Sequence, residues 1–206
     1  MEWGTIVGSI ITGLATLASV YIGRHYFRKS QKDPVVEDTA QSANVYTALQ
    51  YTIQEMQADR AYVLEFHNGG HYYSGRGQQK FSCTHETVEE GISQECSFSQ
   101  EHRVSNYHSY VSELIEDGKF AYLDVEEIED YSFQKMLQHK GVKSIYNVPI
   151  KTLNGKIIGI LGVDYVKTPA LANVIGFRDP KEKSAFDEDS ELLMRRQARV
   201  IAGYLV

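Results

Sequence analysis

The sequence has little positive charge and almost no cysteine. Its 206 residues carry 21 Lys and Arg against 27 Asp and Glu, which gives a formal net charge of −6. Nucleic-acid binding needs clustered basic side chains that neutralise phosphates, so we expect no nucleic-acid partner. The only two cysteines are Cys83 and Cys96. We expect both to be free thiols in the cytoplasm, whereas an oxidising compartment would allow a disulfide between them. The state of the pair therefore tests which compartment contains the domain.

The motifs of common enzyme classes are also absent from the sequence. It contains no Gly-x-Ser-x-Gly elbow, no His-Glu-x-x-His pair and no recognisable nucleophile with an adjacent base. Its glycine-rich stretch is followed by no Gly-Lys-Ser/Thr, which excludes a phosphate-binding P-loop. We therefore expect neither enzymatic activity nor a cofactor.

Cysteine and histidine nevertheless occur in numbers that require a metal site to be considered. Zinc favours four such ligands, but the spacings here match no regular zinc module, so we expect no bound metal. Side chains alternate between the two faces of a strand, so we expect Cys83 and His85 to share one face. The residues considered are Cys83, His85, Cys96, His102 and His108, with His67 and His71 nearby.

An uncharged run begins the chain. It extends from Trp3 to Ile22, and at about 1.5 Å per residue its helix can just cross the roughly 30 Å apolar core of a bilayer. Basic residues follow it at positions 24–32. We expect residues 1–23 to be a single transmembrane anchor, and the positive-inside rule places the following domain in the cytoplasm, at a bacterial inner membrane. A cleaved signal peptide and a buried core helix are the alternatives.

Small residues recur along the predicted anchor. Gly4 and Gly8 form one small-x-x-x-small pair, and Ser9 and Gly13 form another. Such pairs let two helix backbones approach closely in a membrane. We expect the chain to contact the lipid bilayer and to form a homo-oligomer through the anchor, with Gly4, Gly8 and Gly13 at the contact, and through the first soluble helix.

Apolar patterns predict an α+β domain after the anchor. Asn154-Gly155 predicts a type I′ turn between two long strands, and interleaved helices indicate one antiparallel sheet flanked by helices. The expected order is a basic juxtamembrane linker at 24–38, a helix at 39–57, strands at 60–66 and 81–85, a helix at 106–117, a strand at 120–123, a helix at 125–139, strands at 144–150 and 156–166, a polar loop at 167–185 and a helix at 187–204.

The two long strands carry a resemblance to a known family. The first ends in Val148-Pro149-Ile150, and the second contains Gly159-Ile160-Leu161-Gly162. With the element order and the Asp187 start of the final helix, they resemble a GAF-type domain, the sensory fold related to PAS, over the expected domain 39–206. The resemblance implies a GAF/PAS-like antiparallel sheet. It names no ligand, because GAF domains bind cyclic nucleotides, small metabolites, tetrapyrroles or nothing.

A second resemblance is architectural. The lysis holin of T-even bacteriophages is similar in plan, with one N-terminal span, a soluble α+β domain, a late hairpin and a terminal amphipathic helix. That family carries a longer charged stretch before its span. Its soluble domain lies outside the inner membrane, opposite to the orientation that the basic residues at 24–32 predict.

The glycine-rich segment at 67–77 is the most unusual stretch of the domain. Its glycines offer backbone amides to an anion, and its arginine suits a phosphate or carboxylate. We predict a small anionic ligand here, with a flexible loop as the alternative. The candidate ligand-binding residues are His67, Asn68, Gly69, Gly70, His71 and Arg76.

The sequence thus predicts a membrane-anchored, non-enzymatic GAF-like sensor or regulatory interaction module with an unidentified protein partner. The first alternative is a phage-type holin or lysis-control protein, in which the anchor assembles membrane lesions. The second alternative is a scaffold whose domain binds only another protein. A collapsed cavity on the sheet would favour the scaffold.

Overall fold

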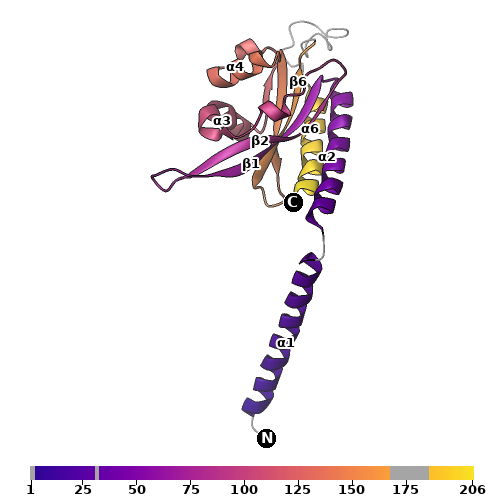
Figure 1. Ribbon diagram of the computed structural model, residues 1–206, viewed down its shortest axis with the longest axis vertical. Coiled ribbons are helices and arrows are strands. Elements are labelled where there is room, and N and C mark those ends of the chain that lie inside the picture. Colours follow the sequence, from indigo (N-terminus) through magenta and orange to yellow (C-terminus); the bar gives the residue numbers. More distant parts are fainter. Residues whose placement is uncertain (1–2, 31–32, 168–185) are drawn as a thin grey trace. The chain divides into compact units, whose positions relative to one another are not determined.

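The computed structural model describes residues 3–30, 33–167 and 186–206. The chain forms two compact units, Met1–Gln41 and Ser42–Val206. In the first unit, α1 (Trp3–Ser30) is a continuous helix whose segment Ile6–Phe27 is long and apolar enough to cross a membrane (Figure 1). A signal sequence or the core helix of a soluble protein would meet the same criterion.

Three hydroxyl groups within α1, those of Thr12, Thr16 and Ser19, donate to backbone carbonyl oxygens of the helix itself. Thr12 Oγ1 donates to the carbonyl oxygen of Gly8 at 2.9 Å, and Ser19 Oγ donates to that of Ala15 at 2.8 Å. An unpaired hydroxyl is costly in hydrocarbon. These bonds therefore make a run with several hydroxyl residues compatible with a bilayer.

The predicted linker at 24–38 overlaps two helices. The first is α1, which continues to Ser30, and the second is α2 (Pro34–Met56), which begins before the expected position 39. Asp33 caps α2, because its Oδ1 accepts from the Val35 amide at 2.9 Å. Pro34 occupies the first helical position, where the missing N–H costs nothing, so this proline starts a helix.

The Ser42–Val206 unit is built on one antiparallel sheet of six strands, in the order β3-β2-β1-β6-β5-β4. This arrangement, with helices on both faces, confirms the predicted α+β class. The predicted loop at 167–185 lies outside the described residues except for its first position. The strands are β1 (Arg60–His71), β2 (Gly77–Val88), β3 (His102–Arg103), β4 (Phe120–Tyr122), β5 (Ser144–Lys151) and β6 (Ile157–Tyr165).

Two layers of helices cover the sheet, one on each face (Figure 1). On one face α2 packs beside α6 (Glu188–Leu205) against the apolar side chains of β1, β5 and β6. On the other face lie α3 (His108–Glu116) and α4 (Tyr131–His139). Short 3₁₀ turns η1 (Cys96–Phe98), η2 (Val104–Tyr107) and η3 (Val125–Glu127) complete this second layer.

The helix predicted at 125–139 is split into two elements. Residues Val125–Glu127 form only the turn η3, and α4 begins at Tyr131. The break occurs at Asp130, whose Oδ1 accepts from the Phe133 amide at 3.1 Å and so caps α4. The other carboxylate oxygen accepts from the Tyr110 amide of α3 at 3.2 Å. One side chain thus joins the starts of two helices.

Some large apolar and aromatic side chains of the two long helices are exposed, and small ones are buried. On α2, Tyr46 and Tyr51 remain 42% and 43% exposed. On α6, Leu192 is 68% exposed, whereas Ala198 and Ala202 are buried against the sheet. Burial here follows the side of the helix that faces the sheet, not the hydrophobicity of the single residue.

Both long hairpins close through the same turn chemistry. At Thr152–Lys156 the Gly155 amide donates to the carbonyl oxygen of Thr152 at 2.9 Å, and at Tyr72–Arg76 the Gly75 amide donates to that of Tyr72 at 2.8 Å. Each turn has its glycine in the left-handed region, at φ +83° and +81°. A type I′ turn needs positive φ at both central residues, so the type predicted for Asn154-Gly155 is wrong.

A β-bulge in β2 determines which side chains face the helices of the second layer. In the pairing with β1, Val63 lies opposite His85 but Leu64 lies opposite Cys83, so Thr84 is the extra residue. Cys83 therefore faces α3 and α4, whereas His85 faces α2 and contacts Ser42. The expected shared face for Cys83 and His85 is wrong because the bulge breaks the two-residue alternation.

Candidate functional site

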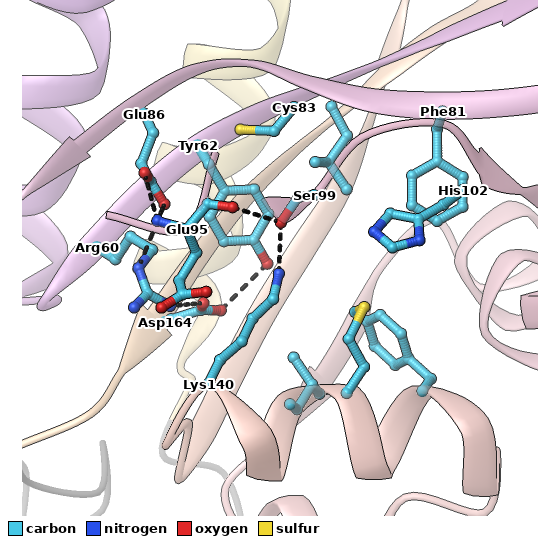
Figure 2. A pocket seen from close by; sticks show the side chains of 14 residues that line it. Arg60, Tyr62, Phe81, Cys83, Glu86, Glu95, Ser99, His102, Lys140 and Asp164 are labelled. Atoms are coloured by element: carbon cyan, nitrogen blue, oxygen red, sulfur yellow. Dashed lines mark hydrogen bonds and ion pairs between the residues drawn. The ribbon is translucent and has the colours of Figure 1, made fainter. Parts of the chain in front are cut away.

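A small cavity lies between the sheet and α4, on the face covered by the second helical layer. The segment 93–103 forms another of its walls (Figure 2). Its volume is about 20 Å³, which is room for about one water molecule. Apolar side chains line one end, with Phe81, Phe133 and Leu137 among them, and charged side chains line the other.

The charged end is organised around Arg60, which is only 1% exposed. In the sheet register Arg60 stands directly opposite Asp164 of β6, and its Nη1 donates to Asp164 Oδ2 at 2.9 Å. Arg60 Nη2 donates to the carbonyl oxygen of Ser93 at 3.1 Å, and Arg60 Nε lies 3.4 Å from Glu86 Oε1. A charge buried this deeply is tolerable only when it is paired.

The Asp164 carboxylate is shared with a second chain of hydrogen bonds across the sheet. Tyr62 donates to Asp164 Oδ1 at 3.1 Å and lies within hydrogen-bond distance of Asn147 Oδ1, at 3.0 Å. Asn147 Nδ2 in turn donates to the Tyr110 hydroxyl at 2.7 Å. The network therefore links three strands, β1, β5 and β6, to helix α3.

Gly162 makes room for this network. It stands between Tyr62 on β1 and Asn147 on β5. A Cβ atom at Gly162 would lie 2.4 Å from Asn147 Oδ1 and 2.4 Å from the Tyr62 ring, which no real structure tolerates. The glycine of this strand therefore permits side chains from neighbouring strands to meet, rather than helix packing on the sheet.

Polar contacts hold the wall at 93–103 to the sheet and to the end of α4 (Figure 2). Glu86 Oε2 accepts from the amides of Glu95 at 2.8 Å and Cys96 at 2.9 Å. Lys140, at the end of α4, donates from Nζ to Ser99 Oγ at 2.6 Å. Lys140 and Ser99 both line the cavity, so this bond joins the end of α4 to the wall across it.

Burial controls the protonation of the groups around the cavity. It raises the pKa of Asp164, although Arg60 opposes that rise, and it raises the pKa of Glu86 against the backbone amides that Glu86 binds. Burial lowers the pKa of His102, and the nearby Lys140 ammonium lowers it further. His102 Nε2 and Arg60 Nε are buried and lack a hydrogen-bond partner among the described residues.

Comparison with solved structures relates this architecture to known domains. The GAF3 domain of Synechocystis sp. PCC6803, in its photoproduct state, is 12% identical, with a TM-score of 0.56 over 80% of this chain and 92% of that chain. The blue-light absorbing form of the Thermosynechococcus elongatus PixJ GAF domain is 18% identical, with a TM-score of 0.56 over 84% and 90%. The GAF domain region of a candidate membrane protein from Geobacter sulfurreducens PCA is 16% identical, with a TM-score of 0.52 over 84% and 100%.

These similarities decide the fold. The Ser42–Val206 unit has a GAF fold. No protein-family model and no curated protein matches the sequence. The predicted GAF-like architecture is confirmed, whereas the resemblance to the holin receives no support from these structures.

The ligand-binding residues predicted from the sequence lie away from the cavity of the GAF-fold unit. Five of them belong to the distal half of β1, and Arg76 belongs to the turn that follows, in a hairpin that projects from the sheet (Figure 1). Asn68 accepts from the Gly70 amide at 3.0 Å, His67 contacts Ser82 Oγ at 2.9 Å, and Arg76 stacks on Tyr72. None of the six lines the cavity. Ligand binding by this hairpin stays a prediction.

The described part of the GAF domain shows no cluster of three or more His, Cys, Asp or Glu side chains arranged to hold a metal ion. The bulge at Thr84 contributes to this result, because it sends Cys83 and His85 to opposite faces of the sheet. His102 stacks among aromatic rings, 5.4 Å from the Phe81 ring centroid. Both cysteines are free thiols.

The residues of the cavity were missed because no motif contains them. Arg60 and Asp164 stand inside strands that are otherwise apolar, in the runs Arg60–Phe66 and Ile157–Val166. Two opposite charges in such strands are a signal of a buried ion pair, because burying either charge without a partner has a high cost in free energy. Nothing in the sequence marks Lys140 and Ser99 as cavity residues. Both lie at the ends of short elements, where a polar residue is expected in any case.

Proposed function

We propose that the protein is a membrane-anchored, non-enzymatic regulatory module whose GAF domain responds to a small molecule in the cavity beside Arg60. One observation carries this proposal: a buried, charged network lines a small cavity across which Lys140 of the α4 end bonds Ser99 of the wall. Buried ion pairs rarely add stability compared with apolar packing, so a network of this size favours a role in recognition. The GAF fold supports a sensory role.

The lining defines the chemistry of the ligand. Arg60 and Lys140 are positive, whereas Glu86, Glu95 and Asp164 are negative, so the charged end offers both donors and acceptors. The opposite end is apolar. A fitting ligand is small, has a polar head that both donates and accepts hydrogen bonds, and has an apolar body. A purely anionic ligand fits the predicted hairpin site better than this cavity.

Opening of the cavity is part of the proposed response. The present volume of about 20 Å³ admits water but no organic ligand, and a cavity this small favours by itself the scaffold alternative. The buried charged network beside it is what favours a ligand. Entry requires Lys140 Nζ to leave Ser99 Oγ, which frees an ammonium group inside the cavity and separates α4 from the wall at 93–103. Ligand binding then selects an open state of the domain.

Thermal unfolding of the full chain in detergent micelles tests ligand binding. We would add cyclic AMP, cyclic GMP and the free amino acids as separate probes, and we expect at least one to raise Tm through binding to the folded state. Tyr62→Phe removes a hydroxyl that donates to the Asp164 carboxylate and should reduce that shift. Tyr72→Phe, in the projecting hairpin, is the matched control and should leave it unchanged. No shift with any probe would favour the scaffold that binds only another protein.

Orientation in the membrane requires a more accessible label than the native thiols provide. Cys83 is 5% exposed and Cys96 is half-buried, so both would react slowly in the folded domain. Ser74, at the tip of the β1–β2 hairpin, is exposed. In a variant with Ser74→Cys and both native cysteines replaced by serine, we expect an impermeant maleimide to label only permeabilised cells. Labelling with only the outer membrane opened would place the domain outside the cytoplasm.

Self-association through α1 is the remaining part of the proposal. A shallow groove on this helix is lined by Gly8, Ser9, Thr12, Gly13 and Thr16. A Cβ atom at Gly8 or Gly13 meets no other atom within 4 Å, so both glycines are open to a second helix. We expect Gly8→Ile with Gly13→Ile to shift the full chain in detergent toward monomer by analytical ultracentrifugation. An unchanged mass would contradict association through this groove.

A further inference from the structure

The fold brings the two cysteines of the chain into contact beside the cavity. Cys96 Sγ donates to the carbonyl oxygen of Cys83 at 3.2 Å, and the Cys83 amide donates to the carbonyl oxygen of Ser99 at 2.7 Å. Gln100 Nε2 lies 2.7 Å from Cys83 O and 2.6 Å from Cys96 O. These bonds fix the backbones of the two cysteines against each other and place the Cys96 thiol against the backbone of Cys83.

The placement of each thiol is set by a separate local feature. The bulge at Thr84 turns Cys83 toward the cavity, where its side chain is buried. Glu86 holds Cys96 by its backbone amide at 2.9 Å, which keeps η1 close to β2. Cys83 is therefore the enclosed partner, and half-buried Cys96 is the partner that a reagent in solution reaches first.

We propose that Cys83 and Cys96 form a reversible intramolecular disulfide, whose oxidant is a low-molecular-weight disulfide such as oxidised glutathione. Cys96, after losing its proton to water, attacks one sulfur of the oxidant and expels a glutathione thiolate. Cys83, likewise deprotonated, then attacks Cys96 Sγ and expels the second glutathione thiolate. Two protein thiols are oxidised to one disulfide, and one small disulfide is reduced to two thiols.

Burial makes this dithiol slow to react. It raises the pKa of both thiols, so little thiolate is present at neutral pH. Brief exposure to an oxidant leaves the pair reduced, and sustained oxidising conditions close it. In a reducing cytoplasm the pair rests as thiols.

The disulfide would fasten the wall at 93–103 to β2 by a covalent bond. This consequence rests on the proposed function, because the same wall carries Ser99, the partner of Lys140. Oxidation would hold Ser99 in place against β2 and oppose the opening that admits a ligand. Formation of the bond itself does not depend on any ligand.

The test uses the full chain in detergent micelles, equilibrated without oxygen in mixtures of reduced and oxidised glutathione. Samples are quenched in acid, denatured and alkylated with a polyethylene-glycol maleimide, and intact mass is measured in parallel. We expect both thiols to disappear together in a monomer that is two hydrogens lighter. Cys96→Ser and Cys83→Ser should each give only a glutathione adduct or a free thiol.

Three results would overturn the proposal. They are a stable glutathione adduct at Cys96 with Cys83 still free, disulfides only between chains, and closure only under denaturing conditions. The wild-type protein supplies a measurement independent of the variants, since oxidised chain should unfold at a higher Tm than reduced chain. A lower Tm after oxidation would show that the bond does not fit the fold. Failure of every ligand probe in both redox states would instead contradict the proposed function and leave the disulfide unaffected.

Discussion

At the scale of single residues, Arg60 has the largest energetic consequence. Its guanidinium group lies beside two buried carboxylates, bonding Asp164 Oδ2 at 2.9 Å and pairing with Glu86 Oε1 at 3.4 Å. Removing one partner of a buried ion pair leaves an uncompensated charge inside the protein. The stability of the domain therefore depends on this side chain more than on any surface charge.

We expect Arg60→Met to lower the free energy of unfolding by about 3–5 kcal/mol at neutral pH. The loss should shrink as pH falls, because burial already raises the pKa of both carboxylates and the loss of Arg60 raises it further. A carboxyl group whose folded-state pKa lies above its unfolded value stabilises the folded state at low pH, where the group is neutral. That stabilisation is lost as pH rises through the folded-state pKa. Urea unfolding at several pH values measures this change.

The matched control for that variant is Arg103→Met. Arg103 is exposed at the sheet edge in β3, and a surface substitution of this kind changes stability by about 0.5 kcal/mol or less. Equal losses for the two arginine variants, or a loss at Arg60 that does not change with pH, would contradict the assignment of Arg60 to a buried ion-pair network.

A second prediction at this scale concerns Gly162. Gly162→Ala places a Cβ atom 2.4 Å from both Asn147 Oδ1 and the Tyr62 ring, so the hydrogen-bond network must separate. We expect a loss of about 1–3 kcal/mol from overpacking alone. Gly203→Ala in α6 is the control, because nothing lies within 4 Å of its Cβ and alanine favours a helix by up to about 1 kcal/mol. Thermal unfolding of both variants should show shifts of opposite sign.

At the scale of elements, Asp130 joins two helices. Its two carboxylate oxygens accept from the amides of Phe133 in α4 and Tyr110 in α3. We expect Asp130→Ala to cost about 1–3 kcal/mol, because it leaves helix-terminal N–H groups without an acceptor. Glu129→Ala, at the exposed neighbouring position, should change little. A small effect at Asp130 in urea unfolding would show that water replaces both caps.

The order of elements was predictable from the sequence because most elements carry a strong local signal. The two long strands around Asn154-Gly155 are runs of β-branched and apolar residues, and both strands were predicted to within one residue at their ends. The turn between them was predicted with the wrong geometry, since only Gly155 adopts positive φ. A dipeptide signals that a turn exists more reliably than it signals which type forms.

Features that depend on pairing between distant segments were not predictable. The bulge at Thr84 arises from the register of β2 against β1, and no residue in β2 marks it. The buried faces of α2 and α6 depend on which side of each helix faces the sheet, so buried Ala198 and exposed Leu192 reverse the order of hydrophobicity. The cavity combines both effects, because its side chains come from strands, turns and a helix far apart in the sequence.

At the scale of the whole molecule, the GAF fold does not imply a light-absorbing pigment. The two cyanobacterial domains with similar folds are described by a photoproduct state and a blue-light absorbing form. A tetrapyrrole needs a cavity of several hundred Å³, so the cavity of about 20 Å³ would have to open much further for it than for the small ligand proposed above. We expect the purified full chain, incubated with biliverdin, to retain no visible absorption band after gel filtration. A band that co-elutes with the protein would contradict this expectation.

The central claim is that the Lys140–Ser99 bond closes a ligand cavity, and the reactivity of Cys83 inside that cavity tests the claim most directly. In the full chain with Cys96→Ser, we would compare the rate of methanethiosulfonate labelling of Cys83 after Lys140→Met and after Lys135→Met. Lys135 lies in α4, where it bonds Gln138 and stands over the Tyr131 ring at the surface, away from the cavity. The account predicts faster labelling with Lys140→Met alone, at unchanged Tm. Equal rates in the two variants would contradict it.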